Sequence, residues 1–211
     1  MVTRLEEMEE VLNKRTVGAY LTQPVVRILA KTRTTPNALT WLGFGLTLGA
    51  VALIIYGHLL AAGFMVLVSS FFDMLDGALA RGTNQVTRFG AILDSTLDRM
   101  SEAGLFLGIL VFYALNATPP STMIILLAGI AMIASFLVSY VRARAEGAGL
   151  DCEVGLLTRT ERVVILILGL LLSRIDYVLV IALGIIAILS SVTVGQRLVY
   201  VWRQTIKSTT K

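Results

Sequence analysis

Four aspartates lie between two long apolar runs of this chain, within residues 73–98. Asp73 and Asp76 are three residues apart, and Asp94 and Asp98 are four apart, so each pair shares one face of a helix. Carboxylates in an apolar segment mark a functional site, because a charge inside a membrane is costly. Gathered together they repel one another unless a cation neutralises them, and hard oxygen ligands suit Mg²⁺ or Mn²⁺. The pattern therefore predicts a divalent-cation site where two helices meet.

The composition is that of an integral membrane protein. Hydrophobic residues make up 56% of the chain and charged residues only 15%, which is unlike a soluble globular domain. Apolar segments of about the length that crosses a bilayer lie at about 38–57, 59–80, 90–114, 121–144, 161–174 and 176–203. The fifth reaches that length only if Glu161 and Arg162 belong to it. We therefore predict an all-α integral membrane protein with six transmembrane helices, which form one domain over residues 35–205.

Residues 1–34 are charged and only intermittently apolar. Leu5, Met8 and Leu12 recur at helical spacing among basic residues, which predicts an N-terminal amphipathic helix on the membrane surface. A helix that packs on the protein itself is the alternative. Thr35 and Pro36 then favour the start of the first spanning helix.

Basic residues are distributed unevenly among the connections. They concentrate in the N-terminal segment, in two of the connections and in the C-terminal tail, and the remaining connections carry few. The positive-inside rule therefore predicts that both termini and the aspartates lie on the cytoplasmic side of the plasma (inner) membrane. The net charge of +4 reflects this topology and contact with anionic lipid, and no nucleic-acid partner is expected. The single cysteine, Cys152, excludes an intrachain disulfide.

The aspartate stretch resembles the signature of the CDP-alcohol phosphotransferase family, D-x2-D-G-x2-A-R-x8-G-x3-D-x3-D. Every fixed identity occurs at the matching spacing: Asp73, Asp76, Gly77, Ala80, Arg81, Gly90, Asp94 and Asp98. The pattern of apolar segments is also similar, so the resemblance covers nearly the whole chain. It implies that a CDP-linked lipid, of the CDP-diacylglycerol type, gives its phosphatidyl group to a second alcohol while CMP leaves.

The resemblance also implies roles for single residues. The implied ligands of Mg²⁺ or Mn²⁺, as two ions, are Asp73, Asp76, Asp94 and Asp98. Asp98 is also implied as the general base that takes the proton of the acceptor hydroxyl. The implied contacts to the CDP-lipid are Gly77, Ala80, Arg81 and Thr87. A homodimer is implied as well. The alternatives are a structural ion network of aspartates with Arg81 and Arg99, and a helix-capping role for Thr87.

A second group of motifs concerns the acceptor. It comprises Tyr140-Val-Arg142-Ala-Arg144-Ala-Glu146, Arg159-Thr-Glu161-Arg162 and Thr193-Val-Gly-Gln196-Arg197. These runs resemble elements of the phosphatidylinositol-phosphate synthases of actinobacteria and of their archaeal archaetidyl counterparts. The resemblance implies that Arg142, Arg162 and Arg197 hold the phosphate of inositol 1-phosphate. The first of these positions is a lysine in the usual pattern, and arginine differs from it because its planar group binds in a bidentate manner.

Several alternatives stay open at this point. A basic pocket also fits glycerol 3-phosphate, the acceptor of a phosphatidylglycerophosphate synthase, and the arginines alternatively serve only topology and contact with headgroups. Both diacylglycerol and archaeol are compatible as the donor lipid. A cation-coupled transporter predicts internal repeats, which the sequence lacks. An intramembrane prenyltransferase also uses aspartate motifs, but it leaves Ala80, Arg81 and Gly90 unexplained.

Overall fold

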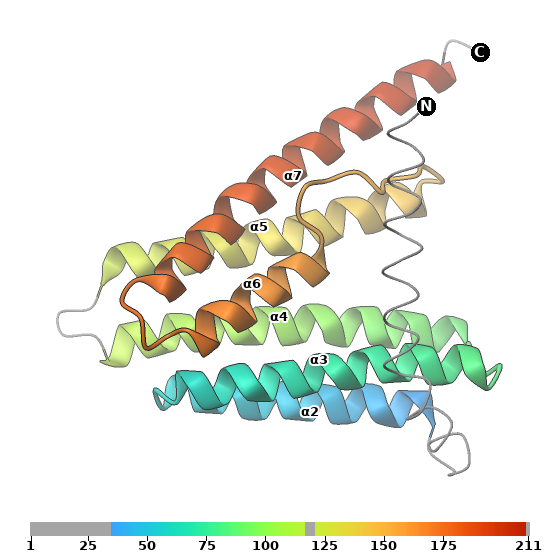
Figure 1. Ribbon diagram of the computed structural model, residues 1–211. Helices are drawn as coiled ribbons and strands as arrows, with labels where there is room; N and C mark the ends of the chain where they lie inside the picture. The colour runs from blue at the N-terminus through green and yellow to red at the C-terminus, as the bar shows by residue number, and fades with distance from the viewer. Residues whose placement is uncertain (1–34, 117–120, 210–211) are drawn as a thin grey trace, which may run out of the picture. The chain divides into compact units, whose positions relative to one another are not determined.

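The computed structural model describes residues 35–116 and 121–209, and every regular element within them is an α-helix. The helices are α2 (Pro36–Ile55), α3 (Leu59–Gly82), α4 (Arg88–Asn116), α5 (Thr122–Gly147), α6 (Arg159–Leu171) and α7 (Val178–Thr209) (Figure 1). Each apolar segment predicted from the sequence is therefore a helix, and the ends differ by a few residues. The predicted amphipathic helix of residues 1–34 lies outside the described residues.

Short polar connections set the helix ends in the first half of the chain. Gly57 adopts φ +83° in the turn after α2, a conformation that glycine reaches without strain. Asn84 takes a left-handed conformation between α3 and α4, with φ 54°. The Thr87 hydroxyl accepts a hydrogen bond of 2.9 Å from the backbone N–H of Gly90, which caps the start of α4.

Long apolar helices make this a multi-pass membrane protein. Among the described residues, α2, α3, α5 and the Val178–Ile206 part of α7 are long and apolar enough to cross a bilayer. Large apolar side chains along α5 recur at helical spacing and are exposed: Met123 79%, Leu126 57%, Ile130 52% and Ile133 59%. Such a stripe is unfavourable in water and stable against lipid tails.

The described helices group into two compact units, and α2, α3 and α4 contribute to both. The first unit contains residues 35–46 and 68–98. Its small core consists of Leu39 from α2 with Leu75, Leu79 and Phe72 from α3. The Ser69 hydroxyl donates a hydrogen bond of 2.8 Å to the backbone carbonyl of Gly43, which ties α3 to α2 beside this core.

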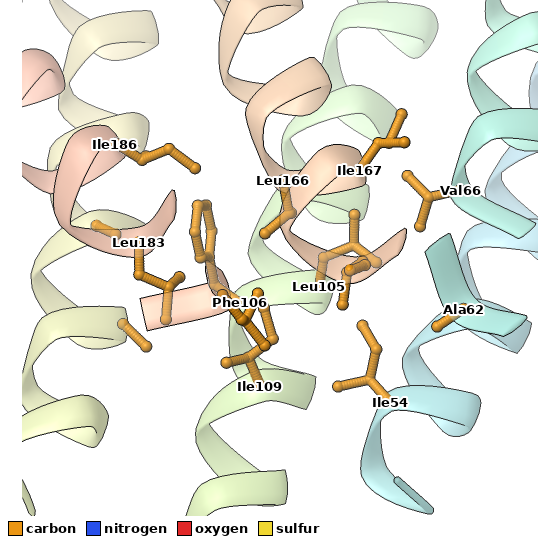
Figure 2. Packing of buried hydrophobic residues seen from close by; sticks show 14 of the residues in the cluster. Ile54, Ala62, Val66, Leu105, Phe106, Ile109, Leu166, Ile167, Leu183 and Ile186 are labelled. Atoms are coloured by element: carbon orange, nitrogen blue, oxygen red, sulfur yellow. The ribbon is translucent and has the colours of Figure 1, made fainter. Parts of the chain in front are cut away.

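The second unit contains residues 47–67, 99–116 and 121–209. Its large core takes side chains from each of the described helices, α2 to α7, and Figure 2 shows Phe106 and Ile109 of α4 beside Leu166 of α6 and Leu183 of α7. Within this unit α7 packs along α5 and also against α6. The packed core fixes these helices, and so it fixes the polar side chains that they carry.

Candidate active site

A cavity of about 260 Å³ lies in the first unit, between the start of α2, the end of α3 and the start of α4. Residues that the sequence assigns to the metal or the donor lipid line it: Asp76, Gly77, Ala80, Arg81, Thr87 and Asp94. Asn37 and Thr40 of α2 line it as well, although sequence reasoning gave them no role. The two halves of the aspartate motif therefore meet at one cavity.

Asp76 is the most buried of the four aspartates, with 4% of its surface exposed. The Thr40 hydroxyl hydrogen-bonds its side chain, and the charges of Asp73 and Asp94 act on it from nearby. Its second oxygen, Oδ2, is buried and has no hydrogen-bond partner in the part of the chain that the structure describes. A buried carboxylate oxygen without a partner is costly, so this atom fits a cation ligand.

The lining of the cavity includes Asp94 of α4 but neither Asp73 nor Asp98. Asp73 is half-buried on α3, and its Oδ1 lies 2.7 Å from the position that a Cβ on Gly43 would take. Asp98 is half-buried on α4, one helical turn after Asp94. Over residues 35–116 and 121–209, no three acidic, histidine or cysteine side chains form a closed metal-binding group. The donor set nevertheless suits a divalent cation, because it consists of hard oxygens and one of them is orphaned.

Arg81 and the glycines shape the wall of the cavity. The Arg81 guanidinium folds back over Gly77, where a Cβ would stand 3.3 Å from Nη1. A Cβ on Gly90 would stand 2.9 Å from the Thr87 hydroxyl and 3.2 Å from Asn37 Oδ1. Thr87 therefore lines the cavity and also caps α4, while its contact with the CDP-lipid stays a prediction.

The arginines assigned to the acceptor lie in the second unit, and the charges of Arg142 and Arg162 both act on Arg197. Arg142 is on α5, and its Nε donates a 2.7 Å hydrogen bond to Glu146. The side chain of Arg142 is 44% exposed. Arg162 and Arg197 are buried, with 1% and 2% of their surface exposed. The structure thus places Arg142 and Arg162 close enough for their charges to act on Arg197, although only Arg142 is exposed.

Arg162 forms an ion pair that the sequence analysis missed. Its Nε and Nη2 donate hydrogen bonds of 2.6 and 2.9 Å to the two carboxylate oxygens of Glu102, which is 5% exposed. Glu102 lies on α4, four residues after Asp98. The signal was present, because a carboxylate at the start of a long apolar helix segment requires a positive partner. What the sequence lacks is any indication of which arginine that partner is.

Arg197 is anchored on backbone carbonyls. Its Nε donates a 2.8 Å hydrogen bond to the carbonyl of Val154, and its Nη1 donates one to the carbonyl of Val138. Val154 lies in the connection between α5 and α6, and Val138 lies in α5. Both partners are neutral, and no carboxylate pairs with Arg197 among the residues that the structure describes. These neutral partners do not offset its positive charge.

The connection between α5 and α6 is held against α7 next to these arginines. The Thr193 hydroxyl accepts a hydrogen bond of 3.1 Å from the backbone N–H of Leu157. Glu161 then caps α6 by accepting the N–H of Thr158 at 2.9 Å, so the helix begins just before Arg162. These contacts explain locally why the Arg159–Arg162 motif opens a helix.

Comparison with known proteins decides the family. A family model described as CDP-alcohol phosphatidyltransferase matches residues 33–197. The chain belongs to the CDP-alcohol phosphatidyltransferase family. That span includes the cavity with its aspartates and all three arginines, so this chain is an enzyme of the CDP-alcohol phosphatidyltransferase class. The family match also sets aside the transporter and prenyltransferase alternatives.

Relatives within the family are similar over most of their length. The phosphatidylinositol phosphate synthase of Mycobacteroides abscessus is 37% identical over 89% of this chain and 86% of the relative. The archaetidylinositol phosphate synthase of Pyrococcus horikoshii is 39% identical over 83% of this chain and 89% of the relative.

Solved structures of a further family member are similar to this fold. The crystal structure of Mycobacterium tuberculosis phosphatidylinositol phosphate synthase with CDP-DAG bound has a TM-score of 0.81 and 35% identity, over 87% of this chain and 94% of that chain. A structure of the same enzyme with manganese and citrate has a TM-score of 0.79 and 36% identity, over 86% of this chain and 88% of that chain.

Proposed function

We propose that this phosphatidyltransferase moves the phosphatidyl group of a CDP-diacylglycerol-type lipid to a hydroxyl of inositol 1-phosphate and releases CMP. The observation that carries the proposal is the gathering of Arg142, Arg162 and Arg197 in one unit, where the charges of the first two act on the third. Guanidinium groups bind phosphate oxygens through directional, charge-assisted hydrogen bonds. Relatives with 35–39% identity that are named for inositol phosphate lipids support the same acceptor.

The donor half of the reaction belongs to the first unit. The proposed ligands of two Mg²⁺ or Mn²⁺ ions are Asp73, Asp76, Asp94 and Asp98, and the orphaned oxygen of Asp76 supports this assignment. When bound, the cations neutralise the pyrophosphate and the charge that develops on the leaving CMP. Arg81 contacts the pyrophosphate, while Gly77, Ala80 and Thr87 leave room for the nucleotide and contact it.

Asp98 is the proposed general base. A hydroxyl oxygen of the acceptor forms a bond to the phosphorus that carries diacylglycerol, and the bond from that phosphorus to CMP breaks. CMP leaves with the electron pair of that bond, and the hydroxyl proton passes to the Asp98 carboxylate. The position of Asp98 one helical turn after Asp94 supports this role, because the base then stands next to a metal ligand on the same helix.

Glycerol 3-phosphate is the second candidate acceptor. It presents the same phosphate group, and one observation on Arg142 favours it as an alternative to inositol 1-phosphate. Arg142 stands where the pattern for inositol phosphate has lysine, and its Nε is already bonded to Glu146. An arginine held in this way offers the phosphate a different set of N–H groups from a lysine, so the fit of the acceptor can change.

We further propose that α4 and α6 complete a bundle of six transmembrane helices, which form one domain over residues 35–205. Residues 1–34 then lie on the membrane surface as an amphipathic helix. The distribution of basic residues supports a cytoplasmic position for both termini and for the aspartates in the plasma membrane. The enzyme is proposed to act as a homodimer.

The purified enzyme in lipid nanodiscs, with CDP-diacylglycerol and Mg²⁺, tests the proposed reaction. Radiolabelled inositol 1-phosphate is expected to enter lipid while an equal amount of CMP is released, and Asp76→Asn is the inactive control. Turnover with glycerol 3-phosphate alone would establish the second candidate. If neither acceptor leads to release of CMP from either donor lipid, the proposal is overturned. A parallel assay with CDP-archaeol in place of CDP-diacylglycerol identifies the donor.

A further inference from the structure

Glu102 carries a buried charge for which the proposed reaction has no direct use. Both of its carboxylate oxygens bond to Arg162, at 2.6 Å to Nε and 2.9 Å to Nη2. The two side chains are 5% and 1% exposed. A two-point contact of this kind fixes the plane of the guanidinium group as well as its position, since the carboxylate and the fork of N–H donors are both planar.

The pairing leaves one nitrogen of Arg162 without a partner. Nη1 is buried and has no hydrogen-bond partner within the described part of the chain. A buried, charged N–H group without an acceptor is unfavourable, and such groups in native structures call for an explanation. Glu102 already occupies the edge of the guanidinium formed by Nε and Nη2. Nη1 is therefore the nitrogen that remains to donate a hydrogen bond to an oxygen of a bound ligand.

We propose that Glu102 is a positioning residue, which holds Arg162 so that Nη1 is directed at the phosphate of the acceptor alcohol. This inference rests on the proposed function, in which Arg162 binds that phosphate. Glu102 does not touch the acceptor and acts only through Arg162.

Two opposing effects of Glu102 make the inference testable. Its negative charge offsets the charge of Arg162, so on net charge alone its removal strengthens the attraction for a phosphate. Its two hydrogen bonds, however, fix the orientation of the guanidinium, and their loss weakens binding to the same phosphate. The sign of the change in acceptor KM therefore reveals which effect dominates.

The test uses the full-length enzyme in nanodiscs, with steady-state kinetics for both substrates and a thermal unfolding midpoint for each variant. Glu102→Gln is expected to raise the KM for inositol 1-phosphate about tenfold and to leave the KM for CDP-diacylglycerol within about twofold. Glu102→Asp, which keeps the charge but withdraws it by one methylene, is expected to show a smaller rise. Asp176→Asn removes one carboxylate from an exposed position in the connection between α6 and α7 and serves as the matched control.

A double variant separates a positioning role from a purely structural one. If Glu102 acts through Arg162, then Glu102→Gln adds nothing to the acceptor KM once Arg162→Lys is present, because the geometry it holds is already lost. If the ion pair is purely structural, Glu102→Gln instead lowers the unfolding midpoint and leaves the acceptor KM unchanged at temperatures where the variant is folded.

The outcomes distinguish this inference from the proposed function. An unchanged or lowered acceptor KM in Glu102→Gln, together with a raised one in Arg162→Lys, overturns the positioning role and leaves the proposed reaction in place. An unchanged acceptor KM in Arg162→Lys removes Arg162 from the acceptor site, and the positioning role falls with it. If Glu102→Gln does not fold, Glu102→Asp decides, since an acceptor KM equal to that of the unmodified enzyme overturns the inference.

Discussion

The carboxylate of Asp73 occupies the space that a side chain on Gly43 would need: Oδ1 lies 2.7 Å from the position of the missing Cβ. The close approach of α2 and α3 in the first unit is supported at the same level by the hydrogen bond from Ser69 to the Gly43 carbonyl. A glycine in the middle of an apolar helix costs helix stability, and at position 43 the close contact with Asp73 supplies a packing reason for it. That reason is the position of a proposed metal ligand.

Gly43→Ala is therefore expected to displace Asp73 and weaken cation binding. Changes that disturb the supports of metal ligands typically cost about 10–100-fold in metal affinity. The concentration of Mn²⁺ for half-saturation, measured by electron paramagnetic resonance, should rise by a factor within that range. The concentration of Mg²⁺ that gives half-maximal turnover should rise in parallel. Gly45→Ala is the matched control on the same helix, because a Cβ there meets nothing within 4 Å. Equal Mn²⁺ binding in both variants would contradict the prediction.

Asp98→Asn should abolish turnover and largely spare donor binding. The amide has the shape of the carboxylate but cannot accept the acceptor's proton, so a loss of about 10²–10⁴-fold in kcat is expected. Binding of CDP-diacylglycerol, measured by protection against thermal unfolding in the presence of Mg²⁺, should remain. Loss of that protection would instead show that Asp98 serves mainly as a metal ligand.

Gly155→Ala is expected to disturb the connection between α5 and α6. Gly155 has φ +143°, and a Cβ there would stand 2.5 Å from Thr193 Cγ2 and 3.4 Å from Arg197 Nε. Backbone strain and this contact together should lower stability by about 1–3 kcal/mol and raise the acceptor KM. Gly149→Ala is the control, because its φ of +75° brings backbone strain without any contact within 4 Å. Similar kinetics in the two variants would show that the contact with Thr193 is unimportant.

Cys152 should react slowly with thiol reagents, and the rate should depend on pH. The side chain is fully buried, and burial raises the pKa of the thiol above its ordinary value of 9.0. Because the folded-state pKa is raised, the buried neutral thiol favours the folded state below about pH 9, and this contribution is lost as the pH rises through the folded pKa.

Maleimide labelling of Cys152 should thus be much slower at pH 8 than labelling of a reference thiol, and the difference should narrow at higher pH. The reference is Asp151→Cys in a chain that also carries Cys152→Ser, since residue 151 is exposed in the same connection. Equal labelling rates at pH 8 would contradict the burial of Cys152.

The apolar segments of the sequence were sufficient to locate the helices that the structure describes. The second apolar segment was expected at about 59–80, and α3 covers Leu59–Gly82. The fifth was expected at about 161–174, whereas α6 covers Arg159–Leu171, because the cap formed by Thr158 and Glu161 moves its start and a turn follows its end. Apolar patterns report burial of side chains and say little about the capping bonds that end a helix.

Only part of the candidate site could be predicted from the sequence. The turn predicted between the two aspartate pairs was sufficient to bring Asp76 and Asp94 to one cavity, because two helices joined by a short turn place their adjacent ends together. Helix spacing alone did not predict that Asp73 and Asp98 stay outside the lining. The partners of the arginines were not predictable in that way. Glu102 and Arg162 are 60 residues apart, and the partners of Arg197 are backbone carbonyls, which every residue possesses. Only tertiary packing selects among such partners.

The two carbonyl bonds of Arg197 have a consequence for protein engineering. Through them one side chain of α7 holds both α5, at Val138, and the connection after it, at Val154. A chimaera that transplants residues 148–158 from a relative therefore keeps this anchor only if the transplanted backbone places a carbonyl where that of Val154 lies.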